Sequence, residues 1–308
     1  MTEGKQRVWR IDREISLRAQ LSAFQRGAGD PTTRWGADGS FARGAQTPDG
    51  PGALHLTSRP AEATVEAIAW GPGADWLLES VPDLLGSGDD PSGFEPRHPV
   101  IADAWRRFSH WRVPRSRLVL DALVPAVIEQ KVTGQEAFSG YRRLVRRFGE
   151  PAPGPFGAAL WVPPPAAGWA RIPSWAWLQA SVDGARSRAV VGAARVAGRL
   201  EQCVGLTLPQ ARSRLTALPG IGVWTAAEVS QRALGDADAV SFGDYHVAKD
   251  IGWALIGRPV DDARLAELLE PYAGHRYRVQ QLLALAGHRR PRRGHRMAPR
   301  THLPTRAR

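Results

Sequence analysis

Asp244 is a carboxylate in a sequence context where it could take part in chemistry. It lies in the Gly-rich loop Ala239-Val-Ser-Phe-Gly-Asp-Tyr-His-Val, directly before a predicted helix over 245–255. An aspartate in this position commonly caps the helix, because its side chain accepts hydrogen bonds from the first backbone N–H groups. A carboxylate can also stabilise a developing positive charge and orient or deprotonate a water molecule. The two roles are compatible, and the loop by itself leaves both open.

About twenty residues earlier, a short sequence predicts a tight hairpin between two helices. Helical apolar spacing ends at Pro219, resumes at Trp224 and closes at Gly235. The glycines between them permit a sharp turn and leave backbone N–H groups unpaired at a helix N-terminus, where the macrodipole favours an anion. The predicted hairpin consists of Leu218, Pro219, Gly220, Ile221 and Gly222. It fits a clamp on any phosphate backbone, or an ordinary corner between two helices.

The hairpin, the Gly-rich loop and Asp244, in this order, resemble the helix-hairpin-helix DNA glycosylases, and in particular the bacterial 3-methyladenine DNA glycosylase II family. The resemblance implies an α+β fold that is mostly helical, with Asp244 as the catalytic aspartate. It also implies a monofunctional glycosylase of base excision repair, which flips alkylated purines out of double-stranded DNA and leaves an abasic site. Two alternatives remain: a glycosylase for other damaged or deaminated bases, and a DNA-binding protein without catalysis in which Asp244 only caps a helix.

The same resemblance implies a pocket for the extruded base. It places Trp224, Tyr272 and Glu228 at pocket positions, and Tyr245 is a further candidate. An alkylated purine is cationic, so an indole favours it by a cation–π term of about 1 to 2 kcal/mol when desolvated. This charge also weakens the glycosidic bond, so one carboxylate suffices. Glu228 stands where the family has a second aromatic residue, which leaves the substrate range open.

Two further positions follow from the resemblance. The family's duplex wedge corresponds to the turn at Gln130 and Lys131, although better-known members have an apolar side chain there. The alternative is an ordinary surface lysine. Relatives that also cut the strand carry a lysine directly before the Thr-Ala of the second hairpin helix, and that position is Trp224 here. Water is therefore the expected nucleophile.

Residue composition along the chain predicts three parts. Short β-like stretches between Gly, Asp and Pro clusters predict a small antiparallel α/β domain over 1–95. Helical periods predict an all-helical core of two lobes flanking an active-site cleft over 96–287, interrupted by an irregular Pro/Gly-rich connection over 151–173. The Arg-rich segment 288–308 has no apolar period, so it is predicted to be a disordered basic tail.

Net charge and cysteine content limit which partners and cofactors the protein could bind. The net charge of +11 favours a polyanionic partner, but eight of the 41 basic residues lie in 289–308, which holds no acid, so the remainder carries only +3. A basic face must therefore be local. The single cysteine, Cys203, excludes an intramolecular disulfide and a four-cysteine iron–sulfur cluster, and the histidine spacing indicates no metal site. The sequence shows no secretory signal and no membrane segment, so we expect the protein in the cytoplasm, associated with the nucleoid. We also expect a monomer without a cofactor.

Overall fold

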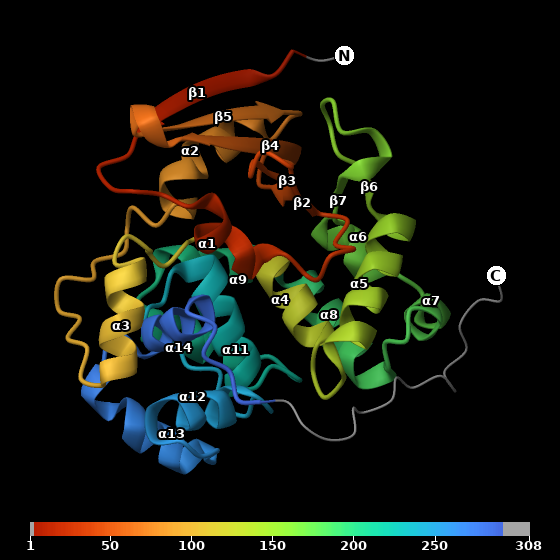
Figure 1. The fold of residues 1–308 in the computed structure, drawn as a ribbon. Coiled ribbons are helices and arrows are strands. Elements are labelled where there is room, and N and C mark those ends of the chain that lie inside the picture. The colour runs from red at the N-terminus through yellow and green to blue at the C-terminus, as the bar shows by residue number, and fades with distance from the viewer. Residues whose placement is uncertain (1–2, 292–308) are drawn as a thin grey trace.

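A small antiparallel sheet packs against a larger group of helices (Figure 1). The computed structural model describes residues 3–291 of the 308. The fold is α+β and mostly helical, as the sequence predicts, and the strands come almost entirely from the first quarter of the chain. Most of the predicted basic tail over 288–308 lies outside the described residues. No helix in the described range is both long and apolar enough to cross a membrane.

The sheet has five antiparallel strands in the order β1-β5-β4-β3-β2. They are β1 (Lys5–Arg10), β2 (Thr33–Trp35), β3 (Phe41–Thr47), β4 (Gly50–Arg59) and β5 (Thr64–Trp70). Burial alternates along β5, where Val65, Ala67 and Ala69 are fully buried, as period-two geometry requires of a sheet with one covered face. The apolar face packs against α2 (Ala74–Leu84) and α1 (Leu17–Leu21).

The segment over 151–173 is more ordered than the sequence predicts. It contains β7 (Trp161–Val162), which pairs with β6 (Glu150–Pro151), and the helix α6 (Ala166–Arg171). Backbone N–H of Trp161 donates to the carbonyl of Pro31 at 2.7 Å, so this separate two-stranded sheet is bonded to the chain just before β2. The expectation of an irregular connection was wrong here, because the apolar side chains between the prolines are buried against β3 and β4.

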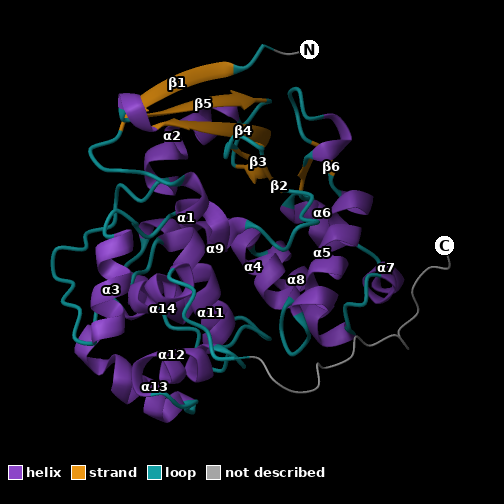
Figure 2. Cartoon of the chain, viewed as in Figure 1, coloured by secondary structure: helices purple, strands orange, loops and turns teal. Residues whose placement is uncertain are grey.

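The remaining helices form the larger part of the molecule (Figure 2). They are α3 (Pro99–Phe108), α4 (Val119–Ile128), α5 (Gly134–Phe148), α7 (Ser174–Gln179), α8 (Gly184–Arg195), α9 (Ala197–Glu201), α10 (Leu208–Thr216), α11 (Val223–Val229), α12 (Val247–Ile256), α13 (Asp262–Leu269) and α14 (Arg276–Leu285). They bury two separate apolar clusters, one around α4 and one among α3, α12, α13 and α14. The division of the chain at 95 and 287 stays a prediction.

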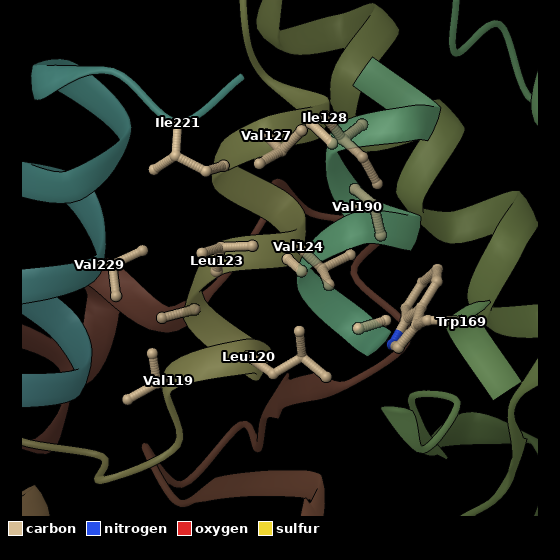
Figure 3. Packing of buried hydrophobic residues seen from close by; sticks show 14 of the residues in the cluster. Val119, Leu120, Leu123, Val124, Val127, Ile128, Trp169, Val190, Ile221 and Val229 are labelled. Carbon is tan, nitrogen blue, oxygen red and sulfur yellow. The ribbon is translucent and has the colours of Figure 1, made fainter. Parts of the chain in front are cut away.

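Helix α4 is the centre of the larger cluster. Its sequence is apolar on almost every face, which is typical of a helix that is covered all round. Figure 3 shows α4 side chains between Ile221 and Val229 on one side and Val190 and Trp169 on the other. Since Ile221 belongs to the predicted hairpin, this packing fixes the hairpin to the middle of the core.

Two largely buried ion pairs join the N-terminal layer to α4. Arg43 of β3 pairs with Asp121, and Arg26 pairs with Glu129 at 2.7 Å. The side chains of Arg43 and Asp121 are 8% and 13% exposed, so each charge depends on the other for compensation. The N-terminal layer therefore sets the position of both ends of α4.

Candidate active site

The loop before α12 holds the carboxylate of Asp244 in a defined orientation. Backbone N–H of Asp244 donates to the carbonyl of Ser241 at 3.1 Å, closing a turn in which Gly243 has φ of 86°. A turn with positive φ at its third residue favours glycine there. The Asp244 Oδ1 atom accepts hydrogen bonds from the N–H groups of His246 at 2.6 Å and Val247 at 3.0 Å. Asp244 therefore binds backbone N–H groups at the start of α12, whose N-cap residue is His246 and which begins two residues later than the sequence predicts.

The second carboxylate oxygen faces the hairpin helix. Trp224 Nε1 donates to Asp244 Oδ2 at 3.3 Å, and Trp224 is only partly buried at the start of α11. Beside the carboxylate, the ring of Tyr245 is 67% exposed, with the ammonium of Lys249 at 3.5 Å from its centroid. The structure thus brings together Asp244, an indole and a second aromatic ring, which come from two separate elements.

The turn between α10 and α11 is an exposed hairpin with a buried anchor. Pro219, Gly220 and Gly222 are exposed, while Ile221 is 4% exposed and packs into the α4 cluster. Leu218, at the start of the hairpin, is partly buried against the same cluster. Gly220 has φ of 84°, which favours glycine. Within residues 3–291, the N–H groups of Gly220 and Gly222 donate no hydrogen bond. They remain open to an external anion at this helix N-terminus.

The turn between α4 and α5 lies against this hairpin. The Gln130 Nε2 group donates to the carbonyl of Gly220 at 2.9 Å and to Thr225 Oγ1 at 2.8 Å. The next residue, Lys131, is exposed and has φ of 55°, a left-handed conformation that a lysine seldom adopts. The two predicted wedge residues are therefore placed differently: Gln130 is hydrogen-bonded to the hairpin, and Lys131 is exposed in a left-handed turn. Gln130 would have to give up two hydrogen bonds to enter a duplex.

Glu228 does not line an open pocket, which corrects the expectation from its sequence position. It is 7% exposed, and its carboxylate accepts from Arg232 Nη1 at 2.7 Å and from Ser241 Oγ at 2.6 Å. Burial by itself raises the pKa of Glu228, but the charge of Arg232, the Ser241 hydrogen bond and the charge of Arg26 outweigh it, so the pKa lies below the usual value. The carboxylate is a buried anion with both oxygens occupied.

Tyr272 is likewise covered, contrary to the expectation of a pocket wall. It is 2% exposed in the turn η6 (Glu270–Tyr272), and its hydroxyl accepts from the N–H of Arg97 at 3.1 Å and lies 2.6 Å from His98 Nδ1. Its ring packs near Phe94, with centroids 6.0 Å apart. The apolar cluster of α3 and α14 takes up the ring, so no face of it is open for stacking.

Sequence reasoning missed the polar residues behind Asp244. Immediately after α11, the π-helical turn η5 (Ser230–Leu234) carries Gln231 and Arg232 inward. Its widened geometry leaves the carbonyls of Arg232 and Ala233 to accept from the N–H groups of Ser116 and Arg117. The spacing of four between Glu228 and Arg232 could have indicated their ion pair. Nothing in the sequence marks the link to Ser241.

A surface hollow of about 480 Å³ is lined by Leu218 of the hairpin together with residues of α9 and α10, but not by Trp224 or Asp244. Within the described range, no three His, Cys, Asp or Glu side chains come together as metal ligands.

This fold and site define a class. The chain superposes on a 3-methyladenine DNA glycosylase from Archaeoglobus fulgidus with a TM-score of 0.73, at 16% identity, over 90% of this chain and 96% of that one. An 8-oxoguanine glycosylase/lyase from Clostridium acetobutylicum, in complex with DNA containing 8-oxoguanine, gives 0.68 at 12% identity over 92% and 96% of the two chains. The chain therefore has the fold of the helix-hairpin-helix DNA glycosylases.

Similarity in sequence is more local. Over 148 residues, the chain is 33% identical to a Mycobacterium tuberculosis protein described as a probable bifunctional transcriptional activator/DNA repair enzyme AlkA. The match covers 46% of this chain and 29% of that protein, so the chain corresponds to under a third of its relative's length. No family model matches the chain.

Proposed function

We propose that this protein is a monofunctional DNA glycosylase that removes alkylated purines of the 3-methyladenine type from double-stranded DNA. The observation that carries the proposal is the Asp244 carboxylate, which is held by the N-terminus of α12 and faces the indole of Trp224. The hairpin directly before Trp224 also presents N–H groups that are unpaired within residues 3–291. A carboxylate, an aromatic face and a phosphate grip are what a base-flipping hydrolase requires.

In this mechanism the damaged nucleotide leaves the base stack and its base packs against Trp224. The positive charge of an alkylated purine favours contact with the indole and weakens the glycosidic bond. As the bond breaks, Asp244 Oδ2 stabilises the oxocarbenium-like sugar and orients or deprotonates the attacking water. Oδ1 remains bound to the N–H groups of His246 and Val247 at the start of α12, so the carboxylate keeps its orientation through the reaction.

The DNA backbone is held without reading the sequence. The N–H groups of Gly220 and Gly222 bind a phosphate at the start of α11, where the helix dipole adds to the attraction. Lys131, which is exposed in its left-handed turn, occupies the gap in the duplex. Gln130 links these two contacts through the carbonyl of Gly220.

Water rather than a lysine acts as the nucleophile in this proposal. The residue directly before Thr225 is Trp224, which has no amine, and the ammonium of Lys249 rests on the Tyr245 ring. The product is an intact strand with an abasic site. Borohydride treatment of the reacting mixture should trap no covalent adduct. A trapped adduct would instead identify an amine nucleophile, with Lys131 and Lys249 as the lysines to replace.

Release of free base tests the proposal directly. Purified protein is incubated with methylated, deaminated and oxidised duplexes, and the released bases are separated by chromatography. Release of methylated purines ahead of the other bases is the expected result. Preferred release of a deaminated or oxidised base would change the substrate class. No release from any duplex, with DNA binding retained, would favour a binding protein in which Asp244 only caps α12.

A further inference from the structure

A chain of buried hydrogen bonds connects the helix behind Trp224 to the loop that carries Asp244. Gln231 Nε2 donates to the carbonyl of Ala239 at 2.7 Å and to Ser241 Oγ at 2.8 Å, and Ser241 Oγ lies 2.6 Å from Glu228 Oε1. Gln231 and Ser241 are each 1% exposed, and Glu228 is 7% exposed. These groups therefore interact with each other and not with solvent.

The donor and acceptor inventory fixes the direction of this chain. A glutamine amide has two N–H donors, and both of those on Gln231 are used, one on Ala239 and one on Ser241. A serine hydroxyl has one proton, which must then be donated to Glu228. The other carboxylate oxygen of Glu228 accepts from Arg232. The hydrogen bonds can therefore run in one direction only, from Gln231 to Ser241 to Glu228, and the Glu228 carboxylate is the final acceptor.

Ser241 is also the first residue of the turn that ends at Asp244. Its carbonyl accepts from the N–H of Asp244 at 3.1 Å, and Gly243 between them donates its own N–H to Asp262 at 2.7 Å. The helix segment 224–232 therefore holds the loop at two points, about one helical turn apart. Glu228 binds Ser241 at the base of the loop, and Trp224 binds Asp244 at its end.

We propose that Ser241, anchored on Glu228, is a positioning residue that holds the Asp244 carboxylate beside Trp224. The expected effect of Ser241 on catalysis rests on the proposed function. Its expected effect on the Asp244 loop rests only on the hydrogen bonds. The Glu228 carboxylate thus serves the site from within the core, at the position where the resembled family presents an aromatic ring. Neither Ser241 nor Glu228 touches the base in this arrangement.

The test compares Ser241→Ala with Ser230→Ala. Ser230 lies in the same helical segment and is fully buried, but its hydroxyl makes no hydrogen bond within the described part of the chain. Ser230→Ala is thus a matched control for loss of a buried hydroxyl. Three quantities are measured for each protein: the single-turnover rate of base release from methylated duplex, the affinity for a duplex with an abasic-site analogue, and amide hydrogen exchange over 239–250.

Ser241→Ala should lower the rate at least about tenfold while the affinity stays within about threefold, because a displaced catalytic group costs rate more than binding. Exchange at the N–H groups of His246 and Val247, which are bonded to Asp244, should rise. Ser230→Ala should change none of the three quantities, and Ser241→Thr, which keeps the hydroxyl, should restore most of the rate. If Ser241→Ala is unfolded by circular dichroism, the near-isosteric Ser241→Cys takes its place, since a thiol is a weak donor.

An unchanged rate and unchanged local exchange in a folded Ser241→Ala protein would overturn the proposal. So would a loss of DNA affinity with a rise of exchange throughout the chain, because that pattern reports general destabilisation. If the wild-type protein releases no base from any duplex, the proposed function fails. The exchange comparison then still decides whether Ser241 holds the Asp244 loop.

Discussion

The two oxygens of Asp244 have different neighbours, and this difference separates its two roles. Oδ1 accepts from the N–H of His246, directly before α12, and from that of Val247, its first residue, whereas Oδ2 meets one long hydrogen bond from Trp224. The capping role therefore requires an acceptor oxygen only, and the proposed catalytic role requires the negative charge. A substitution that keeps the oxygen and removes the charge distinguishes them.

Asp244→Asn should therefore keep the fold and keep DNA affinity within about tenfold, yet abolish most base release. Asparagine caps helices about as well as aspartate, so thermal unfolding should change little. The measurements are single-turnover excision, duplex binding and the midpoint of thermal unfolding. Excision close to the wild-type rate would remove Asp244 from the mechanism.

Glu228 gives a prediction about stability and pH. Its pKa is lowered in the folded protein, where Arg232 outweighs the effect of burial, so ionised Glu228 contributes stability at neutral pH. That contribution is present above the unfolded pKa of about 4.3 and is lost as the pH falls through the folded pKa. Glu228→Gln should cost about 3 to 5 kcal/mol at pH 7, because Arg232 is left as a buried unpaired charge.

Urea unfolding at pH 7 and at about pH 3 measures this effect. The difference between wild type and Glu228→Gln should shrink at the lower pH, because below the unfolded pKa of about 4.3 the unfolded wild-type chain takes up a proton at Glu228, and the stability from its ionised form declines. Glu79→Gln, on the exposed face of α2, is the control and should match wild type at pH 7. A difference that is equal at both pH values would show that shape, and not charge, accounts for the loss.

At the scale of elements, the hairpin combines a strained turn with a buried anchor. Gly220 has φ of 84°, and a Cβ atom added there would lie 2.8 Å from the Cβ of Ala189 in α8. Gly222 has φ of −94°, and an added Cβ would meet nothing within 4 Å. The two glycines of one motif therefore have different structural requirements, although the sequence presents them alike.

Gly220→Ala should destabilise the fold by about 1 to 2 kcal/mol and weaken duplex binding, because both the positive φ and the contact with Ala189 oppose a side chain. Gly222→Ala should leave stability within about 0.5 kcal/mol of wild type. Denaturant unfolding measures the stability of both variants, and binding to undamaged duplex measures their affinity. If Gly222→Ala keeps its stability but loses affinity, the backbone at this residue approaches the phosphate directly. Equal stability of the two variants would contradict the turn geometry described here.

For the whole molecule, buried charges join the sheet layer to the helical core. The Arg43–Asp121 pair lies between β3 and α4, and the Arg26–Glu129 pair lies at the end of α4 that leads to Lys131. Burial raises the pKa of Glu129, and the charge of Arg26 opposes this shift. The N-terminal layer therefore supports, through the loop residue Arg26, the geometry of the turn that carries the proposed wedge.

Arg43→Ala should cost about 3 to 5 kcal/mol of folding free energy, because Asp121 is left buried without its partner. Lys5→Ala breaks an exposed ion pair with Asp75, whose side chains are 59% and 66% exposed, and should have no measurable effect. Unfolding of both variants in urea provides the comparison. Similar stabilities for Arg43→Ala and wild type would mean that the sheet layer and α4 are held by apolar packing alone.

The sequence by itself determined the features that depend on neighbours along the chain. The hairpin at 218–222 follows from Pro and Gly between two apolar helical periods, and the capping position of Asp244 follows from its place before α12. The N-terminal strands follow from short β-like stretches between turn residues. Each of these features depends on local backbone geometry, which is determined by the types of a few consecutive residues.

Only the tertiary structure decided which side chains meet across the chain. Glu228 and Tyr272 occupy sequence positions that predicted pocket walls, yet one forms a buried ion pair and the other enters an apolar cluster. Gln130 is bound to a hairpin 90 residues away in sequence, and Ser241 is linked to Asp244 and Glu228 at once. These contacts depend on how whole helices pack against one another, and the spacing of residues along the chain does not reveal that packing.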